Sequence, residues 1–274
     1  MPPLPRIGER RLVRTGLIVV VVTVALLVLV APLVVIFTAA FSKGLGFFAA
    51  TIAHPDTLHA IMLTVLTALI AVPINTLFGV AAAWAVTKFD FPLKRLLIIV
   101  IEIPFSISPI VAGVAYLFVY GLQGLFGPLL QSADVKILFA LPGIVLASMF
   151  VTAPFVAREL IPLMQAQGRD LEEAATSLGA SGWRTFWRVT LPNIRWPMLY
   201  GIVLCNARVM GEFGAVSVVS GSIRGQTNTL PLQISQVFND FNVTGAFAAA
   251  STLALIAVVT LLLKSTLESK AGWR

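Results

Sequence analysis

Long apolar blocks with almost no charge constrain this chain more than any other feature of its sequence. The 274 residues are 58% hydrophobic and 11% charged, whereas soluble domains average about 45–50% apolar and ~25% charged residues. A helix of about 20 residues crosses a ~30 Å hydrocarbon core, so an apolar block of 18 or more residues indicates a transmembrane helix. The sequence therefore predicts an all-α, polytopic membrane protein.

The apolar blocks divide the chain into six predicted transmembrane spans. The first follows a positively charged segment, but its apolar run exceeds the ~7–15 residues of a secretory signal peptide, so we expect it to be retained. A single membrane domain over residues 16–263 is expected, with an N-terminal tail at 1–15 and a C-terminal tail at 264–274. The predicted spans are Gly16–Phe41, Leu58–Val86, Leu96–Tyr120, Ile137–Leu160, Pro197–Ser220 and Val243–Leu263.

Lysine and arginine are shared unequally between the two sides of these spans. Fifteen of the 19 fall on the side that holds both termini, three fall on the opposite side, and Arg208 lies within a span. The three are Lys43, Lys136 and Arg224. Because cytoplasmic loops carry the excess of Lys and Arg, both termini are expected in the cytoplasm. The basic residues behind the net charge of +7 are distributed among the loops and do not gather in one region. A nucleic-acid-binding surface is therefore not expected.

A polar two-part hairpin at residues 169–192 separates the fourth and fifth spans on the cytoplasmic side. Asp170 stands at an N-cap position, and Glu173 three residues later completes a capping-box pattern. Gly179 is placed to end the first helix in a left-handed conformation. Ser181 can cap a second short helix, which Leu191-Pro192 is expected to stop.

The apolar residues of the hairpin favour a surface that meets something outside the chain. They recur at helical spacing and predict a narrow stripe on one face of the first helix. This pattern fits two structures: an amphipathic hairpin lying on lipid headgroups, or a docking element for a cytoplasmic partner. The stripe residues are Leu171, Ala174, Ala175 and Leu178.

The same hairpin resembles the EAA motif of ABC-importer permeases. That motif is Glu-Ala-Ala, three residues, Gly, nine residues, Ile, one residue and Leu-Pro, and here Val189 takes the isoleucine position. The resemblance implies a fold like that of type I ABC importer permeases, in which the hairpin is a coupling helix that docks on a separate ATPase subunit. The matching residues are Glu173, Ala174, Ala175, Gly179, Leu191 and Pro192.

The chain has no GxxxxGK[ST] loop to hold nucleotide phosphates. It is therefore predicted to be a non-catalytic subunit with no cofactor of its own, and ATP and Mg²⁺ are expected on the partner ATPase. The two histidines, His54 and His59, are five residues apart, Asp56 is the only acidic residue between them, and Cys205 is the single cysteine. This set does not predict a metal site.

Residues 207–234 resemble the permease branch that serves tetrahedral oxyanions, and most closely the W-type sulfate/thiosulfate permease subunit. The resemblance is carried by Gly211-Glu212-Phe213-Gly214, by Ser217 to Gly221, and by the Ile223-Arg224-Gly225 and Thr227-Asn228-Thr229 segments. It implies import of sulfate or thiosulfate across a bacterial inner membrane. The implied partners are an ABC ATPase dimer, a paralogous T-type permease and a periplasmic sulfate/thiosulfate-binding protein. A permease for molybdate or another oxyanion, or an ion-coupled secondary transporter, remains an alternative.

Charged residues within the predicted spans are candidates for the translocation path, because ionisable groups at membrane depth are costly and face the bundle interior. Arg208 and Glu212 lie one helical turn apart in the fifth span. They either brace one another as an i, i+4 pair or place Arg208 beside the anion. Two serines of the Pro104–Pro109 segment, Ser106 and Ser108, are predicted to line the same path near a helix break, where free backbone N–H groups suit an anion.

Overall fold

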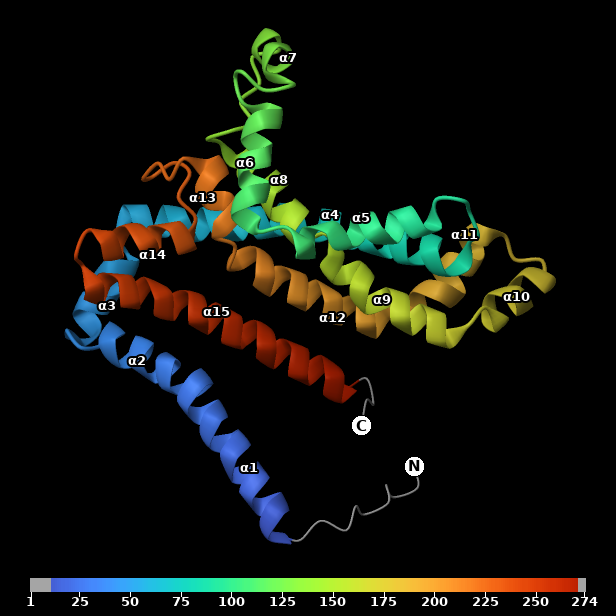
Figure 1. Cartoon of the computed structure of the whole chain (residues 1–274), viewed down its shortest axis with the longest axis horizontal. Helices are drawn as coiled ribbons and strands as arrows, with labels where there is room; N and C mark the ends of the chain where they lie inside the picture. The colour runs from blue at the N-terminus through green and yellow to red at the C-terminus, as the bar shows by residue number, and fades with distance from the viewer. Residues whose placement is uncertain (1–10, 271–274) are drawn as a thin grey trace.

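The computed structural model describes residues 11–270, which form helices and connecting turns without a strand. The predicted all-α fold is confirmed. Helices α4, α9, α12 and α15 run side by side along the long axis of the molecule, and α6 projects to one side (Figure 1). The elements are α1 (Arg11–Ala25), η1 (Leu26–Val30), α2 (Ala31–Ala40), α3 (Gly44–Ile52), α4 (Pro55–Lys88), α5 (Lys94–Ser106), α6 (Pro109–Tyr120), α7 (Gly127–Ser132), α8 (Leu141–Thr152), α9 (Pro154–Gln167), α10 (Asp170–Ser177), α11 (Gly182–Thr185), η2 (Phe186–Thr190), α12 (Leu191–Met210), α13 (Gly214–Ser220), α14 (Leu230–Asn239) and α15 (Val243–Lys270).

Three of the predicted spans are single long apolar helices in the structure: Val13–Ala40, Pro55–Lys88 and Leu141–Gln167. The fourth span therefore runs past the predicted end at Leu160. The sixth begins at Val243, and α15 continues to Lys270, so much of the predicted C-terminal tail is helical. The predicted tail residues 1–10 and 271–274 lie outside the described part of the chain.

The third predicted span is not one straight helix. Helices α5 and α6 meet at 110°, and the two residues between them, Ile107 and Ser108, have extended ψ angles of 133° and 134°. Proline disfavours the helical conformation of the residue before it, so Pro109 ends one helix and begins the next. The sequence had indicated an opening at this segment, and the structure shows its size.

The fifth predicted span differs at both ends from the prediction. Leu191-Pro192 does not stop the second hairpin helix, because the helix continues from Gly182 to Met210. The π-helical turn η2 comes directly before the proline, and its last hydrogen bond joins the Leu191 N–H to the Phe186 oxygen. Pro192 thus lies just after the π-helical turn inside a continuous helix, where its missing N–H removes one hydrogen bond without ending the helix. Beyond Met210 the chain bends by 51° into α13.

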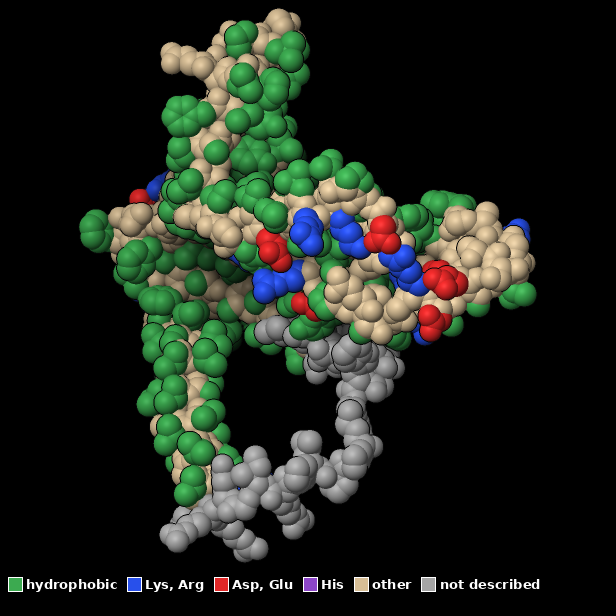
Figure 2. Space-filling view, turned by 45° about the vertical axis from the view of Figure 1, so that its right-hand side comes forward, with side chains coloured by type: hydrophobic (Ala, Val, Ile, Leu, Met, Phe, Trp, Pro, Cys, Tyr) green, Lys and Arg blue, Asp and Glu red, His purple; other side chains and the backbone are tan. Residues whose placement is uncertain are grey.

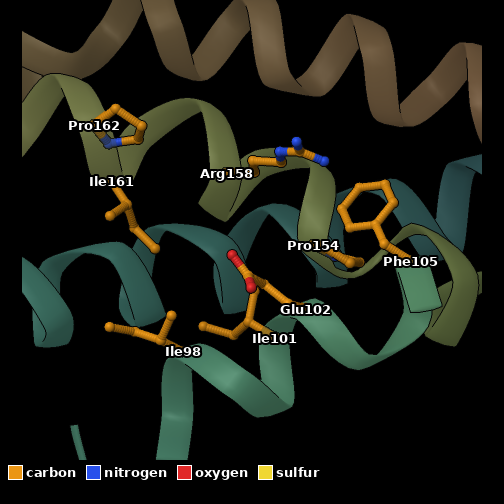
Figure 3. A pocket seen from close by; sticks show the side chains of 8 residues that line it. All are labelled: Ile98, Ile101, Glu102, Phe105, Pro154, Arg158, Ile161 and Pro162. Carbon is orange, nitrogen blue, oxygen red and sulfur yellow. The ribbon is translucent and has the colours of Figure 1, made fainter. Parts of the chain in front are cut away.

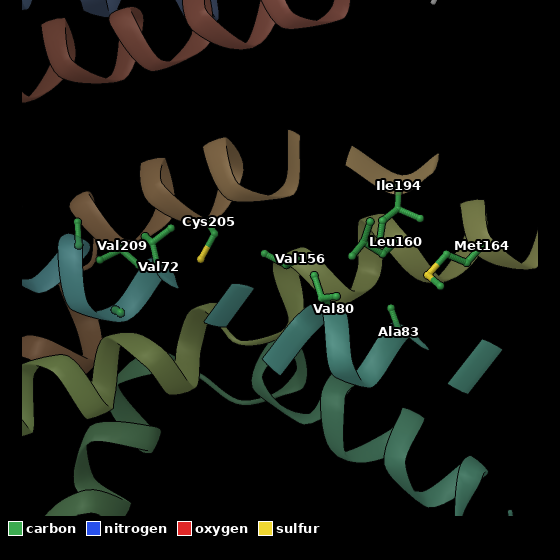
Figure 4. Close-up of a cluster of buried hydrophobic side chains, with 11 residues drawn as sticks. Val72, Val80, Ala83, Val156, Leu160, Met164, Ile194, Cys205 and Val209 are labelled. Atoms are coloured by element: carbon green, nitrogen blue, oxygen red, sulfur yellow. The ribbon is translucent and has the colours of Figure 1, made fainter. Parts of the chain in front are cut away.

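The main hydrophobic core lies between α4, α9 and α12, where Val72, Val80, Val156, Leu160 and Ile194 pack together (Figure 4). Close approach of α4 and α9 depends on Gly79, because a Cβ there would lie 2.6 Å from the Val156 Cβ. Helices α1 and α2 instead expose their apolar side chains, which cover that arm of the molecule (Figure 2). The hairpin lies at one end of the core, where α9 ends and α12 begins. The bend between α12 and α13 lies at the opposite end of α12.

Candidate functional site

The first hairpin helix, α10, begins at Asp170 and follows Arg169, and no side chain caps its first turn. The predicted capping box with Asp170 as N-cap is therefore wrong. Asp170, Glu172 and Glu173 all lie in the first turn instead. Their carboxylates stabilise the helix through the positive end of its dipole, so the acidic residues favour the same helix by a different interaction.

Gly179 ends α10 in the predicted left-handed conformation, with φ at +83°. The Ala180 N–H bonds to the Ala175 oxygen at 3.0 Å, and the Gly179 N–H bonds to the Thr176 oxygen at 2.9 Å. These two hydrogen bonds form a Schellman motif, which requires a residue tolerant of positive φ at this position. Ser181 then accepts a hydrogen bond from the Arg184 N–H at 3.4 Å, which confirms it as the cap of the second helix.

The apolar stripe of α10 faces away from the rest of the chain. Leu171 is 57% exposed and Leu178 is 89% exposed, and the hairpin forms one extremity of the molecule (Figure 1). On α11 and η2, Trp183 and Trp187 are also exposed and pack edge-to-face against each other. The predicted stripe therefore exists and has no cover from this chain's described residues.

The hairpin is joined to the end of α4 by an ion pair that sequence reasoning missed. Lys88 Nζ lies 2.9 Å from Glu172 Oε1, and both side chains are largely buried. Lys88 also donates to the Gly168 oxygen at 2.5 Å, and the Thr190 hydroxyl donates to Glu172 Oε1 at 3.1 Å. Glu172 directly precedes Glu173, the first position of the motif, so the motif gave no reason to select it.

A second, exposed set of charges surrounds the turn after α4. Asp90 pairs with Lys94 at 3.1 Å and with Arg169 at 3.3 Å. The hydrogen bonds from Lys94 and Arg169 lower the pKa of Asp90 below its usual value. The contribution of these ion pairs to folding stability is therefore present above the ordinary pKa of an aspartate, and it is lost as the pH falls through the lowered pKa of Asp90. The loop keeps its charge pattern at neutral pH.

The two helix bends come together within the membrane domain. A Cβ at Gly214, the first residue of α13, would lie 2.9 Å from the Pro109 Cβ at the start of α6. Farther along the same contact, a Cβ at Gly113 would lie 2.8 Å from the Ala215 oxygen. Glycine at both positions lets α6 and α13 touch, so the break between α5 and α6 lies beside the bend between α12 and α13.

Arg208 and Glu212 form the predicted i, i+4 ion pair at this bend, with 2.6 Å between Arg208 Nη1 and Glu212 Oε2. The Glu212 side chain is only 1% exposed, whereas that of Arg208 is 35% exposed. Glu212 Oε1 also accepts a hydrogen bond from the Ala215 N–H at 3.0 Å. Glu212 thus stabilises the first turn of α13 as well as holding Arg208.

Ser106 and Ser108, the other predicted path residues, lie at the break and are exposed. Within residues 11–270 neither hydroxyl takes part in a hydrogen bond, and neither serine contacts Arg208 through one. Ser106 ends α5, and Ser108 directly precedes α6, the helix that packs on α13. Neither serine bonds to Arg208 or Glu212, the two residues of the ion pair. The two serines are exposed and do not form one site with Arg208.

A cavity of about 100 Å³ lies between α5 and α9 (Figure 3). Two charged side chains, Glu102 and Arg158, stand on its opposite walls. The sequence placed Arg158 at the cytoplasmic end of the fourth span, but α9 continues nine residues further to Gln167. Arg158 therefore lies inside a helix and not at its end. The lining residues are Ile98, Ile101, Glu102, Phe105, Pro154, Arg158, Ile161 and Pro162.

Solved structures show the same fold. The chain aligns over 95% of its length, and 95% of the other chain, with a component of a bacterial alginate ABC transporter in complex with an alginate pentasaccharide-bound periplasmic protein, at a TM-score of 0.79 and 16% identity. A second structure, of a bacterial ABC transporter involved in the import of alginate, aligns at a TM-score of 0.73 and 15% identity over 96% of each chain. At these identities the likeness shows the architecture alone.

Sequence relatives are much closer. The chain is 55% identical to the sulfate transport system permease protein CysW of Escherichia coli, over 92% of this chain and 85% of that protein. It is 52% identical to the CysW protein of Synechococcus elongatus, over 90% and 86%. Identity to the E. coli permease protein CysT is 33%, over 81% and 80%.

The family model for the binding-protein-dependent transport system inner membrane component matches residues 75–272. That stretch includes the hairpin, both helix bends and the cavity between α5 and α9. With CysW proteins at 50–55% identity over most of the chain, the chain belongs to the inner membrane components of binding-protein-dependent transport systems, the ABC importer permeases, and within them to the CysW sulfate permeases.

Proposed function

We propose that this chain is a membrane subunit of an ABC importer and provides part of the path by which sulfate or thiosulfate crosses the membrane. The single observation that carries the substrate is the 50–55% identity to CysW proteins over about nine tenths of the chain. The lower identity to CysT proteins supports a complex in which a T-type paralogue is the other permease. Molybdate transport would require a substrate change within this closely related group.

The hairpin is the proposed contact with the ATPase subunit. Its exposed stripe, bounded by Leu171 and Leu178, offers apolar surface that has no use within this chain. ATP and Mg²⁺ would bind to the ATPase dimer, and this chain would carry no cofactor. Movement of the ATPase would reach the membrane helices through α10, because Lys88 and Glu172 join α10 to the end of α4.

The proposed orientation places the hairpin and both termini in the cytoplasm, in a bacterial inner membrane. The unequal distribution of Lys and Arg supports it, and so does the need for the hairpin to reach a cytoplasmic ATPase. A periplasmic sulfate- or thiosulfate-binding protein would then deliver the anion to the opposite face. Arg208, Glu212, Ser106 and Ser108 are proposed to line the path that the anion follows, with Arg208 as the exposed cation of its ion pair.

The proposal is tested by purifying the chain with its co-expressed neighbours and reconstituting the complex in proteoliposomes. Uptake of labelled sulfate should require ATP inside the cytoplasmic-facing compartment and binding protein on the other side. Unlabelled sulfate and thiosulfate should compete strongly, and molybdate weakly. Uptake driven by an ion gradient without ATP would indicate a secondary transporter, and preferential molybdate uptake would contradict the assigned substrate.

A further inference from the structure

The cavity between α5 and α9 lies between two helices that are long and apolar enough to belong to membrane spans, and not in a loop. Glu102 is eight residues beyond Lys94, the first residue of α5, and Arg158 is nine residues before Gln167, the last residue of α9. At 1.5 Å per residue these positions are about 12 Å and about 14 Å from the hairpin end of their helices. The two charged groups therefore lie at similar depth.

Neither charged group makes a direct ion pair with another residue whose side chain the structure describes. The guanidinium of Arg158 lies 4.8 Å from the centre of the Phe105 ring. Both side chains are exposed. Charges of this kind at membrane depth face a water-filled space or a protein partner, because lipid would leave them unsolvated.

The surroundings of Arg158 suit an anion. A guanidinium presents planar N–H donors that match tetrahedral oxyanions bidentately, and the Phe105 ring restrains it by a cation–π contact without using those donors. The rest of the wall is apolar, with Ile98, Ile101 and Ile161. An electrostatic contact is stronger beside apolar walls than in open water, and the cavity has room for several water-sized groups.

We propose that Arg158 binds the transported sulfate at this cavity and that Glu102 limits how tightly it is held. This inference rests on the proposed function. When the cavity is empty, the carboxylate of Glu102 compensates the charge of Arg158 across the space that Figure 3 shows. When sulfate enters, the same carboxylate repels it, so that binding is weak enough for release. A transport path needs this balance, because a site that holds its ion too tightly does not conduct.

The direct test is protection of the cavity from a thiol reagent in the complete complex. The single native cysteine, Cys205, is 0% exposed, so the unmodified chain is the blank. Ile98→Cys places a thiol on the cavity wall with Arg158 intact. Its neighbour Ile99 is 58% exposed and does not line the cavity, so Ile99→Cys is the matched control.

Sulfate should slow the reaction of Ile98→Cys with a small neutral thiol reagent, while chloride of equal ionic strength should not. For one site the rate falls as the fraction of empty sites falls, so sulfate at ten times its dissociation constant should give about a tenfold decrease. Protection should be absent from Ile99→Cys and lost in the double variant Ile98→Cys with Arg158→Gln. Equal labelling of Ile98→Cys with sulfate or chloride would overturn the inference.

Transport measurements supply the second test. Arg158→Gln should reduce sulfate uptake about tenfold or more, because it removes a charge-assisted contact, whereas Arg158→Lys should retain part of it. Glu102→Gln should lower the sulfate concentration needed for half-maximal uptake and reduce the maximal rate. Arg195→Gln is the control, since Arg195 lies over the Trp196 ring at 5.2 Å but outside the cavity.

The outcomes separate this inference from the function on which it rests. A wild-type complex without ATP-dependent sulfate uptake would contradict the proposed function. Normal uptake by wild type together with normal uptake by Arg158→Gln would contradict only the site. If Arg158→Gln instead reduces the amount of assembled complex and sulfate gives no protection, Arg158 pairs with the second permease and the inference is wrong.

Discussion

Lys88, the last residue of α4, forms an ion pair with Glu172 in the first turn of α10, with 2.9 Å between Nζ and Oε1. The lysine side chain is 8% exposed and the glutamate side chain 19%. The same lysine donates to the Gly168 oxygen in the turn before α10. The start of the hairpin is thus joined to α4, a helix of 34 residues that reaches the opposite end of the bundle.

Reversing one charge of this pair should uncouple the hairpin from α4. Lys88→Glu and Glu172→Lys each bring two like charges together at a largely buried position, and breaking such a pair costs about 3–5 kcal/mol when the remaining charge has no partner. We expect sulfate uptake to fall at least tenfold in each single variant and to recover in part in the double variant. Uptake is measured in proteoliposomes and normalised to assembled complex.

The exposed pair of Asp90 and Lys94 is the control for that prediction. Its side chains are 75% and 30% exposed, and such surface pairs contribute about 0–1 kcal/mol. Asp90→Asn should therefore leave uptake within about twofold of wild type. Equal effects of Asp90→Asn and Glu172→Lys would show that the buried pair has no special part in coupling.

Gly179 is expected to be essential for its backbone conformation rather than for space. A Cβ at this position meets nothing within 4 Å, but φ is +83°. Gly179→Ala should therefore cost about 1–2 kcal/mol of local stability and lower both ATPase binding and uptake. Gly182 also has open space around it and lacks the positive φ, so Gly182→Ala should be close to neutral. Matching losses in the two variants would argue against the conformational explanation.

Leu178 should be required for ATPase binding and for little else. Its side chain is 89% exposed, so Leu178→Asp should not disturb the fold of this chain. We expect the variant to insert into the membrane normally and to lose the ATPase subunit during purification. Leu93→Asp changes another exposed leucine, 61% exposed in the turn before α5, and should retain the ATPase. Retention of the ATPase by Leu178→Asp would show that the stripe does not dock.

The cap on α13 predicts an order of severity for substitutions at Glu212. Glu212→Gln keeps an oxygen that can accept from the Ala215 N–H, whereas Glu212→Ala leaves that donor and Arg208 without a partner. Assembly and thermal stability of the complex should therefore fall more in Glu212→Ala, by about 1–3 kcal/mol. Equal melting temperatures for the two variants would contradict the capping role.

The same geometry changes what a charge exchange can reveal. An arginine at position 212 cannot accept the Ala215 N–H, so exchanging Arg208 and Glu212 should fail even if their ion pair is only structural. Arg208→Gln against Arg208→Lys is the better comparison. If Arg208 contacts the anion, uptake per assembled complex should fall in Arg208→Gln and be retained in part in Arg208→Lys. Equal uptake by the two variants would indicate that Arg208 only forms a structural ion pair with Glu212.

Cysteine labelling tests the proposed orientation in intact cells. Cysteines introduced at Lys43, Lys136 and Arg224 should react with an impermeant reagent from outside, and one at Arg184 in the hairpin should not. Buried Cys205 provides a low background. Reaction at Arg184→Cys with the other three sites silent would reverse the topology and remove the hairpin from the cytoplasmic side.

Local sequence determined the helices and the hairpin of this protein. Apolar blocks long enough to cross a bilayer predicted where the membrane helices lie. The Gly179 end of α10 was readable because a left-handed glycine involves only adjacent residues, whereas the capping box predicted at the start of α10 is wrong. The spacing of apolar residues also indicated which face of the first hairpin helix is exposed and apolar. The proline pair around residues 104–109 showed where a helix must open, since proline restricts its own backbone and that of the preceding residue.

Only the tertiary structure decided which of these pieces meet. The ion pair of Lys88 with Glu172 and the cavity that holds Glu102 and Arg158 each join residues distant in sequence. The 110° turn sets where α6 lies relative to α5. Hydrophobic periodicity does not predict such contacts, because it shows which side of a helix is apolar and not which other helix packs on that side. Close packing at Gly79, Gly113 and Gly214 decides which helices meet, since a Cβ at any of these positions would lie less than 3.0 Å from a neighbouring helix.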